Sequence, residues 1–121
     1  MAKHNILGQK GEDLAKSYLI LHGYKILAEN WRYKHLEIDL IASIDNELCF
    51  VEVKTRKNRF FGEPEKALTI QKQKNILIAA QEYIDVYQID AEIRFDLITV
   101  VSDLPEAEII HYPAVFQPFL F

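Results

Sequence analysis

The chain has 121 residues, half of them apolar, and a formal net charge of −4 at pH 7. This length suits one domain with one hydrophobic core and excludes two, and the overall negative charge excludes a protein that binds nucleic acid over its whole surface. No apolar run reaches the ~20 residues of a membrane-spanning helix, and the four histidines lack the spacing of a zinc site. The single cysteine cannot form an internal disulfide, and the start of the chain lacks the apolar core of a secretion signal. Both features predict a cytoplasmic protein.

The first predicted element is a helix over residues 5–22. Apolar residues between Leu14 and Leu19 recur at the i, i+3, i+4 spacing of a buried helical stripe. Gly23 can take the left-handed backbone conformation that ends many helices. Residues 24–28 favour a short strand, and Glu29-Asn30 favours a turn after it.

Two apolar runs, IDLIA and LCFVEV, predict the next two strands. The turn residues Asp45-Asn46 lie between them, so we expect a hairpin. Residues 68–87 have a helical pattern with Thr69 as a candidate N-cap, and residues 91–101 predict a further strand. Ile109 to Tyr112 favours an edge strand ended by Pro113, and the apolar tail after it is expected to pack on the body or on a partner. The helix between the third and fourth strands serves as a crossover, which predicts an α/β fold with a mixed central sheet flanked by helices.

Three charged residues lie inside the apolar hairpin, and their register suggests a site. With a two-residue turn at Asp45-Asn46, Asp39 faces Glu52 and Glu37 faces Lys54, all on one face of the sheet. Directly opposed residues have Cβ atoms ~4.5–5.5 Å apart, and like charges so placed are destabilising. A divalent cation such as Mg²⁺, which takes carboxylate oxygens, would relieve this repulsion.

Other interpretations of the hairpin stay open. A longer turn would offset the two carboxylates diagonally, and a one-residue slip would place them on opposite faces and remove the site. The pair could also line a solvated face, with Glu37 and Lys54 forming a cross-strand ion pair worth under about 1 kcal/mol.

Charge is unevenly distributed along the chain. Seven basic and two acidic residues lie between Lys54 and Lys74, a local charge of +5, whereas eight acidic residues and one basic residue lie between Glu82 and Glu108, a local charge of −7. A local basic surface on an acidic protein can hold a phosphate backbone in one place. The alternative is two solvated faces of opposite sign.

Several stretches together resemble a known family: GEDLAKSYLILHGYKIL, EIDLIA, FVEVKTR, KQK and RFDLITV. They are similar to the bacterial YraN-like family, uncharacterised protein family 0102, which is placed in the restriction-endonuclease-like superfamily. The resemblance covers roughly residues 8–101. It implies an α-β-β-β-α-β core, with residues 1–121 forming one nuclease-like domain.

The resemblance also implies roles for individual residues. Asp39 and Glu52 would hold the metal, and Lys54 would orient the attacking water or stabilise developing charge. Glu12 matches an acidic residue that this superfamily often supplies from its first helix, although it could equally be a helix N-terminal acid favoured by the macrodipole. Glu37 could be a further ligand or the partner of Lys54. Two residues that match the family's Arg-Phe-Asp could form a structural ion pair: Arg94 and Asp96.

These observations together predict a divalent-metal-dependent endonuclease that uses Mg²⁺ or Mn²⁺ to hydrolyse phosphodiester bonds in DNA. By analogy with junction resolvases, branched or single-stranded structures are expected substrates and a homodimer is an expected assembly. Phe60 and Phe61 could stack on an unpaired base. A non-catalytic nucleic-acid-binding or scaffold protein that retains the nuclease fold is the alternative, and a protein-interaction module is a third. Five basic residues are expected to contact the nucleic-acid backbone: Arg56, Lys57, Arg59, Lys72 and Lys74.

Overall fold

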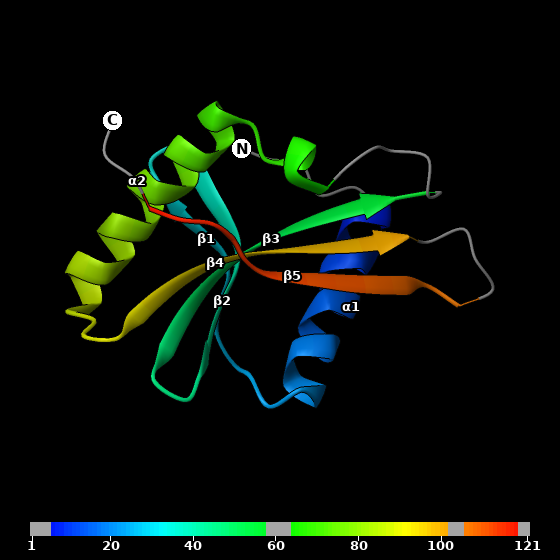
Figure 1. Cartoon of the computed structure of the whole chain (residues 1–121), viewed down its shortest axis with the longest axis horizontal. Helices are drawn as coiled ribbons and strands as arrows, with labels where there is room; N and C mark the ends of the chain where they lie inside the picture. The colour runs from blue at the N-terminus through cyan, green and yellow to red at the C-terminus, as the bar shows by residue number, and fades with distance from the viewer. Residues whose placement is uncertain (1–5, 58–63, 102–105, 119–121) are drawn as a thin grey trace.

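Two helices and five strands make up the main architecture of the chain (Figure 1). The computed structural model describes residues 6–57, 64–101 and 106–118. Its strands form one sheet in the order β1-β2-β3-β4-β5, in which neighbours are antiparallel except for the parallel pair β3–β4. The elements are α1 (Ile6–Leu21), β1 (Lys25–Tyr33), β2 (Leu36–Ile44), β3 (Glu47–Arg56), the short 3₁₀ helix η1 (Pro64–Ala67), α2 (Ile70–Tyr87), β4 (Glu92–Val101) and β5 (Glu108–Phe116).

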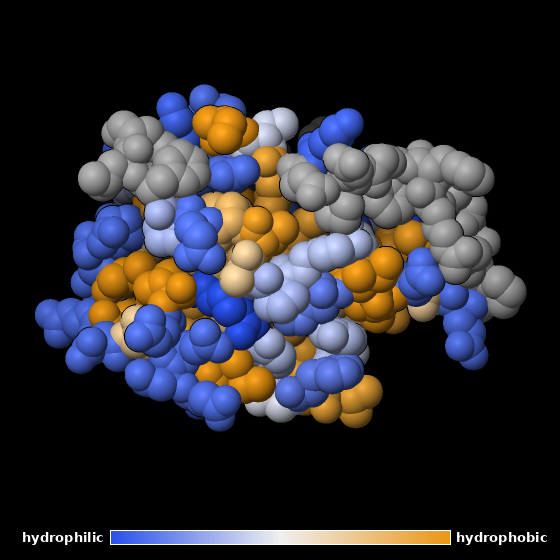
Figure 2. All heavy atoms as spheres, in the orientation of Figure 1, coloured by the Kyte–Doolittle hydropathy of each residue, from blue (hydrophilic) through white to orange (hydrophobic). Residues whose placement is uncertain are grey.

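The two helices cover opposite faces of the sheet, and each closes its own hydrophobic cluster (Figure 1). Ala15 and Leu19 of α1 pack on one face, whereas Ile76 and Tyr83 of α2 pack on the other. Figure 2 shows that apolar side chains on the viewed surface are interspersed with hydrophilic ones. The predicted α/β class, with a mixed sheet between helices, is confirmed. No helix in the three described ranges is long and apolar enough to cross a membrane.

The predicted helix ends are confirmed. Gly23 has φ 91°, in the left-handed region that glycine adopts without steric cost. At the start of α2, the Thr69 hydroxyl accepts a hydrogen bond from the Lys72 backbone N–H at 3.2 Å. These two ends direct the chain from α1 into β1 and from η1 into α2.

The predicted hairpin and crossover are also confirmed. Asp45 has φ 51° in the two-residue turn, and the β2–β3 pairs run from Ile44–Glu47 to Leu40–Val51 with no shift. The parallel pairing of β3 with β4 requires a crossover connection, and α2 provides it. The turn therefore sets the predicted register from Ile44–Glu47 as far as Leu40–Val51.

Two predicted boundaries are wrong. The chain does not turn at Glu29-Asn30: β1 continues to Tyr33, with Asn30 at φ 49°, and the turn follows it at Lys34, φ 58°. Asparagine is enriched in this left-handed conformation both in turns and at strand irregularities, so its presence alone did not distinguish the two.

The last strand also extends further than predicted, because β5 runs through Pro113 to Phe116. Proline is tolerated on an edge strand, where its missing N–H need not pair. The register of β5 shifts beside Pro113, and Phe116 stacks on Phe95 with ring centroids 4.9 Å apart. This part of the apolar tail packs on the body, as expected, while residues 119–121 lie outside the described ranges.

Candidate active site

The alternation of side chains in β2 shifts by one residue at Asp39. Leu40 and Ala42 belong to the cluster that α1 closes, whereas Ile38 and Ile41 belong to the cluster that α2 closes. In a regular strand, residues on one face are two apart, but Ile38 and Ile41 are three apart. Asp39 is therefore an extra residue at a local break in the strand.

The neighbouring strand β1 breaks at the same level. Ala28 and Trp31 both pack against the cluster that α2 closes, again three residues apart. The paired residues on either side, Glu29 with Leu40 and Trp31 with Ile38, leave Asn30 opposite Asp39. The irregularity of β1 at Asn30 therefore lies opposite that of β2 at Asp39. At such a position the side chain need not point toward one face of the sheet or the other.

The Asp39 carboxylate lies against β3. The paired residues of the β2–β3 ladder run as far as Leu40–Val51, and beyond this pair the Oδ2 atom of Asp39 accepts the Val53 backbone N–H at 2.8 Å. This side-chain bond satisfies a main-chain donor near the end of that ladder. It also brings Asp39 beside Glu52, the residue that the predicted register places opposite it.

The Glu52 carboxylate acts electrostatically on Asp39. The pKa of Asp39 is raised well above its ordinary value, first by burial and then by the negative charge of Glu52. The charge of Glu12 and a side-chain hydrogen bond with Glu52 raise this pKa further, while the Val53 N–H opposes the shift. Burial and the neighbouring carboxylates therefore disfavour the ionised form of Asp39.

Two lysines flank Glu52, which is 5% exposed. The Nζ atom of Lys72, from the first turn of α2, lies 3.0 Å from Glu52 Oε2, and that of Lys54 lies 3.8 Å from the same atom. Burial alone would lower the pKa of Lys72, but the charge of Glu52 and the hydrogen bond with it raise this pKa. The sequence assigned Lys72 to nucleic-acid contacts and gave no sign of its contact with Glu52.

Asn30 connects the remaining acidic candidates, and the sequence did not identify it. Its Nδ2 atom donates to Glu12 Oε1 at 2.9 Å and lies 3.3 Å from Glu37 Oε2. Glu37 also forms an ion pair with Arg32 at 3.3 Å. Glu12 and Glu37 thus belong to a polar group next to Asp39.

Helix α1 reaches this group because it approaches β3 unusually closely. Gly11 is buried, and a Cβ atom at this position would lie 1.8 Å from the Thr55 Oγ1 atom. Any larger side chain would push the helix outward. The glycine next to Glu12 therefore sets the distance between that carboxylate and the carboxylate pair.

The predicted nucleic-acid contacts lie on two elements near the pair. Arg56 and Lys57 follow Lys54 at the end of β3, where Lys57 is exposed, and Lys74 is half-buried on α2. Arg59 lies outside the described residues, as do Phe60 and Phe61.

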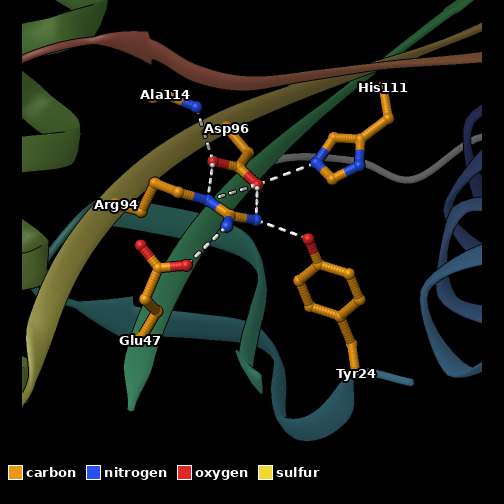
Figure 3. A network of polar contacts seen from close by, with 6 residues as sticks. All are labelled: Tyr24, Glu47, Arg94, Asp96, His111 and Ala114. Carbon is orange, nitrogen blue, oxygen red and sulfur yellow. Dashed lines mark hydrogen bonds and ion pairs between the residues drawn. The ribbon is translucent and has the colours of Figure 1, made fainter. Parts of the chain in front are cut away.

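A second buried carboxylate belongs to a separate network (Figure 3). Asp96 accepts from Arg94 Nε at 2.9 Å and Nη2 at 2.8 Å, from the Ala114 N–H at 3.0 Å, and lies 2.8 Å from His111 Nε2. Arg94 also bonds Glu47 and the Tyr24 hydroxyl.

Burial would raise the pKa of Asp96, but the hydrogen bonds from His111, Arg94 and Ala114 outweigh burial and lower it. Arg94 and Asp96 thus form the structural ion pair that the sequence analysis suggested.

The pair Asp39–Glu52 supplies hard oxygen donors of the kind that Mg²⁺ binds. A cation there would offset the two effects that raise the pKa of Asp39, first its burial and then the charge of Glu52. Within residues 6–57, 64–101 and 106–118, no group of three or more His, Cys, Asp or Glu side chains is arranged to hold a metal ion. The two carboxylates fit a cation that takes its other ligands from water and substrate.

These features define an α/β protein whose five-stranded mixed sheet carries a carboxylate pair and two lysines at a break between strands. The chain belongs to the uncharacterised protein family UPF0102, whose sequence profile matches residues 11–100. This confirms the family resemblance drawn from the sequence.

Three relatives show how far the similarity extends. UPF0102 proteins of Bacteroides thetaiotaomicron and Bacteroides fragilis are each 46% identical to this chain over 121 residues, the whole length of both proteins. A UPF0102 protein of Flavobacterium psychrophilum is 42% identical over 119 residues, which is 98% of this chain and 100% of that protein.

Proposed function

We propose that this protein is a divalent-metal-dependent endonuclease that hydrolyses phosphodiester bonds in DNA. The observation that carries the proposal is the Asp39–Glu52 pair at a break in the sheet, where burial and then the charge of Glu52 raise the pKa of Asp39. Buried like charges are costly, and such arrangements concentrate at functional sites. The restriction-endonuclease-like resemblance supports the same chemistry.

Each side chain of the site has a role in this proposal. Asp39 and Glu52 would hold one or two Mg²⁺ or Mn²⁺ ions, which polarise the scissile phosphate and acidify a bound water. Lys54, 3.8 Å from Glu52, would orient the attacking water and place a fixed positive charge where negative charge develops. Glu12, held by Asn30, would accept a hydrogen bond from water at the edge of the site.

The basic residues around the pair would position the DNA. Arg56, Lys57, Lys72 and Lys74 supply charge for backbone contacts, which fix the register of the nucleic acid but carry no sequence information. Branched or single-stranded DNA is the proposed substrate and a homodimer the proposed assembly, both by superfamily analogy. We place the activity in the cytoplasm, where the free thiol of buried Cys49 would stay reduced.

A cleavage assay tests the proposal directly. Single-stranded, duplex, flapped and four-way-junction DNA would be incubated with Mg²⁺, with Mn²⁺ and with EDTA. We expect metal-dependent cutting by the wild type and a loss of at least ~100-fold in Asp39→Asn and Glu52→Gln, because each change removes a charged metal ligand while keeping the side-chain shape.

Glu47→Gln is the matched control, because Glu47 is a 41% exposed carboxylate on the same strand that pairs with Arg94 instead. It should cut like the wild type. Absence of cutting on all four substrates with both metals would refute the nuclease proposal, as would full activity in Glu52→Gln.

One observation favours the alternative of a non-catalytic nucleic-acid-binding protein. The Lys72 ammonium already contacts Glu52 at 3.0 Å, so a lysine supplies some of the positive charge that a metal would bring. In that case the wild type would bind DNA equally well in EDTA and Mg²⁺ and would cut none of the substrates.

A further inference from the structure

A pocket of about 200 Å³ opens beside the carboxylate pair. It lies between the start of β2 and one side of α2, where Lys72, Asn75 and Ile76 follow the i, i+3, i+4 spacing of a single helix face. Pockets for drug-sized ligands have volumes of about 300–1,000 Å³, so this one suits a smaller ring system. Its lining residues are His35, Leu36, Glu37, Lys72, Asn75 and Ile76.

The lining combines an apolar surface with hydrogen-bonding groups. Leu36 and Ile76 belong to the cluster under α2 and give the pocket an apolar part of its lining. Asn75 carries both a donor and an acceptor, and Gln71 restrains its amide through a bond to Oδ1 at 3.0 Å. A nucleobase has matching properties, with apolar faces and a polar edge.

Charge argues against a phosphate in the same pocket. The Glu37 carboxylate lines it and disfavours an anion, while the two nearby cations already form ion pairs, Arg32 with Glu37 and Lys72 with Glu52. A carboxylate accepts hydrogen bonds from an exocyclic amino group, as in contacts of acidic residues with cytosine N4, and an asparagine amide pairs with adenine N6 and N7. The pocket chemistry therefore favours amino-bearing bases over thymine.

Lys72 connects the pocket with the candidate active site. Its Nζ atom lies 3.0 Å from Glu52 Oε2, and the same side chain lines the pocket. The charges of Glu37 and Asp39 both act on it. A nucleotide whose phosphate lies at Asp39 and Glu52 would thus place a nearby base at the pocket.

We propose that this pocket binds one unpaired, amino-bearing nucleobase next to the scissile phosphate. The inference rests on the proposed function and extends it, because a base can enter such a pocket only when it is unstacked and unpaired. It therefore assigns the substrate class: single-stranded segments, flaps or extruded nucleotides rather than continuous duplex.

Binding measurements without cleavage test the pocket separately from the chemistry. Fluorescence anisotropy in EDTA would compare labelled single-stranded oligo-dC, oligo-dA and oligo-dT of equal length. We expect the wild type to bind oligo-dC or oligo-dA about tenfold more tightly than oligo-dT, within the range that one good base-edge contact provides.

Asn75→Leu should abolish this preference while affinity for oligo-dT and the melting temperature stay close to wild type. Gln81→Leu is the matched control, because Gln81 also forms an i, i+4 side-chain bond on α2, with Asp85 at 2.9 Å, away from the pocket. It should keep the preference.

Equal affinity of the wild type for the three oligonucleotides, or no binding to any of them, would overturn the pocket proposal, as would an unchanged preference in Asn75→Leu. These outcomes are distinguishable from failure of the nuclease proposal. Base preference without cleavage would retain the pocket and reject the nuclease, whereas Glu52-dependent cleavage without base preference would do the reverse.

Discussion

Removing the Asp96 carboxylate should destabilise the protein more than any comparable change at its surface. The side chain has no exposed area and is contacted by Arg94, His111 and the Ala114 N–H. Asp96→Ala would leave the Arg94 guanidinium, itself 15% exposed, without its main counter-ion, and would leave a buried main-chain donor without its acceptor. It would also release β5 from β4 at the point where their register shifts.

The contacts set the magnitude of this loss. Removing one partner of a buried ion pair costs roughly 3–5 kcal/mol, because the remaining charge is uncompensated. Proteins of this size have a total stability of about 5–15 kcal/mol, so the variant loses a large share of it. At about 3–5 °C per kcal/mol, the melting temperature should fall by roughly 10–20 °C.

Urea denaturation and thermal melting would measure the loss, with Glu47→Ala as the control. Glu47 bonds the same guanidinium at 2.8 Å, but it is 41% exposed, so its removal should cost under about 1 kcal/mol. A loss below about 1 kcal/mol for Asp96→Ala, or equal losses in both variants, would refute the reasoning.

The pKa of Asp96 also determines how this stability difference changes at acid pH. Since the folded-state pKa of Asp96 lies below its ordinary 3.8, its stabilising contribution is present above pH 3.8 and is lost as the pH falls through the folded value. Asp96→Ala should lack this contribution, so its difference from the wild type should shrink at the lowest pH.

Two further changes have opposite expected signs. Gly11→Ala should destabilise by about 1–3 kcal/mol because its Cβ would lie 1.8 Å from Thr55 Oγ1, and Thr55→Ala in the same chain should recover part of the loss in urea denaturation. Asp39→Asn should stabilise the metal-free protein by about 0.5–2 kcal/mol at pH 7. The folded pKa of Asp39 is raised above 3.8, so ionisation costs stability as the pH rises, and the gain in urea denaturation should vanish below pH 3.8. Equal stabilities at pH 7 in EDTA would contradict this account.

The sequence predicts the hairpin well because its determinants are local. A two-residue turn at Asp45-Asn46 allows one register, and the β2–β3 pairs from Ile44–Glu47 to Leu40–Val51 follow it. The same holds for Thr69 and Gly23, whose roles depend on the backbone of their own turn.

The features that the sequence did not reveal depend on contacts between distant segments. Asn30 has the same left-handed conformation that a turn would require, and only its pairing opposite Asp39 shows that it lies at a break between two strands. Lys72 resembles any other lysine of a basic segment until α2 is packed on the sheet and brings its ammonium to Glu52. Pro113 suggested the end of the predicted edge strand, because the pattern did not show that pairing with β4 resumes at Phe116 after a register shift.

The two buried aspartates show why the carboxylate pair, and not the larger network, is the better candidate for function. Both are pushed by burial toward the neutral form, but Asp96 receives enough donors to lower its pKa, so the protein itself satisfies its charge. Asp39 accepts the Val53 N–H but is buried near two further carboxylates, so its pKa is raised and the fold leaves its charge poorly compensated. A group that only stabilised the fold would not need to carry this cost. The unfavourable charge at Asp39 is what a bound cation would convert into binding energy, and this is the physical reason to test metal-dependent chemistry there first.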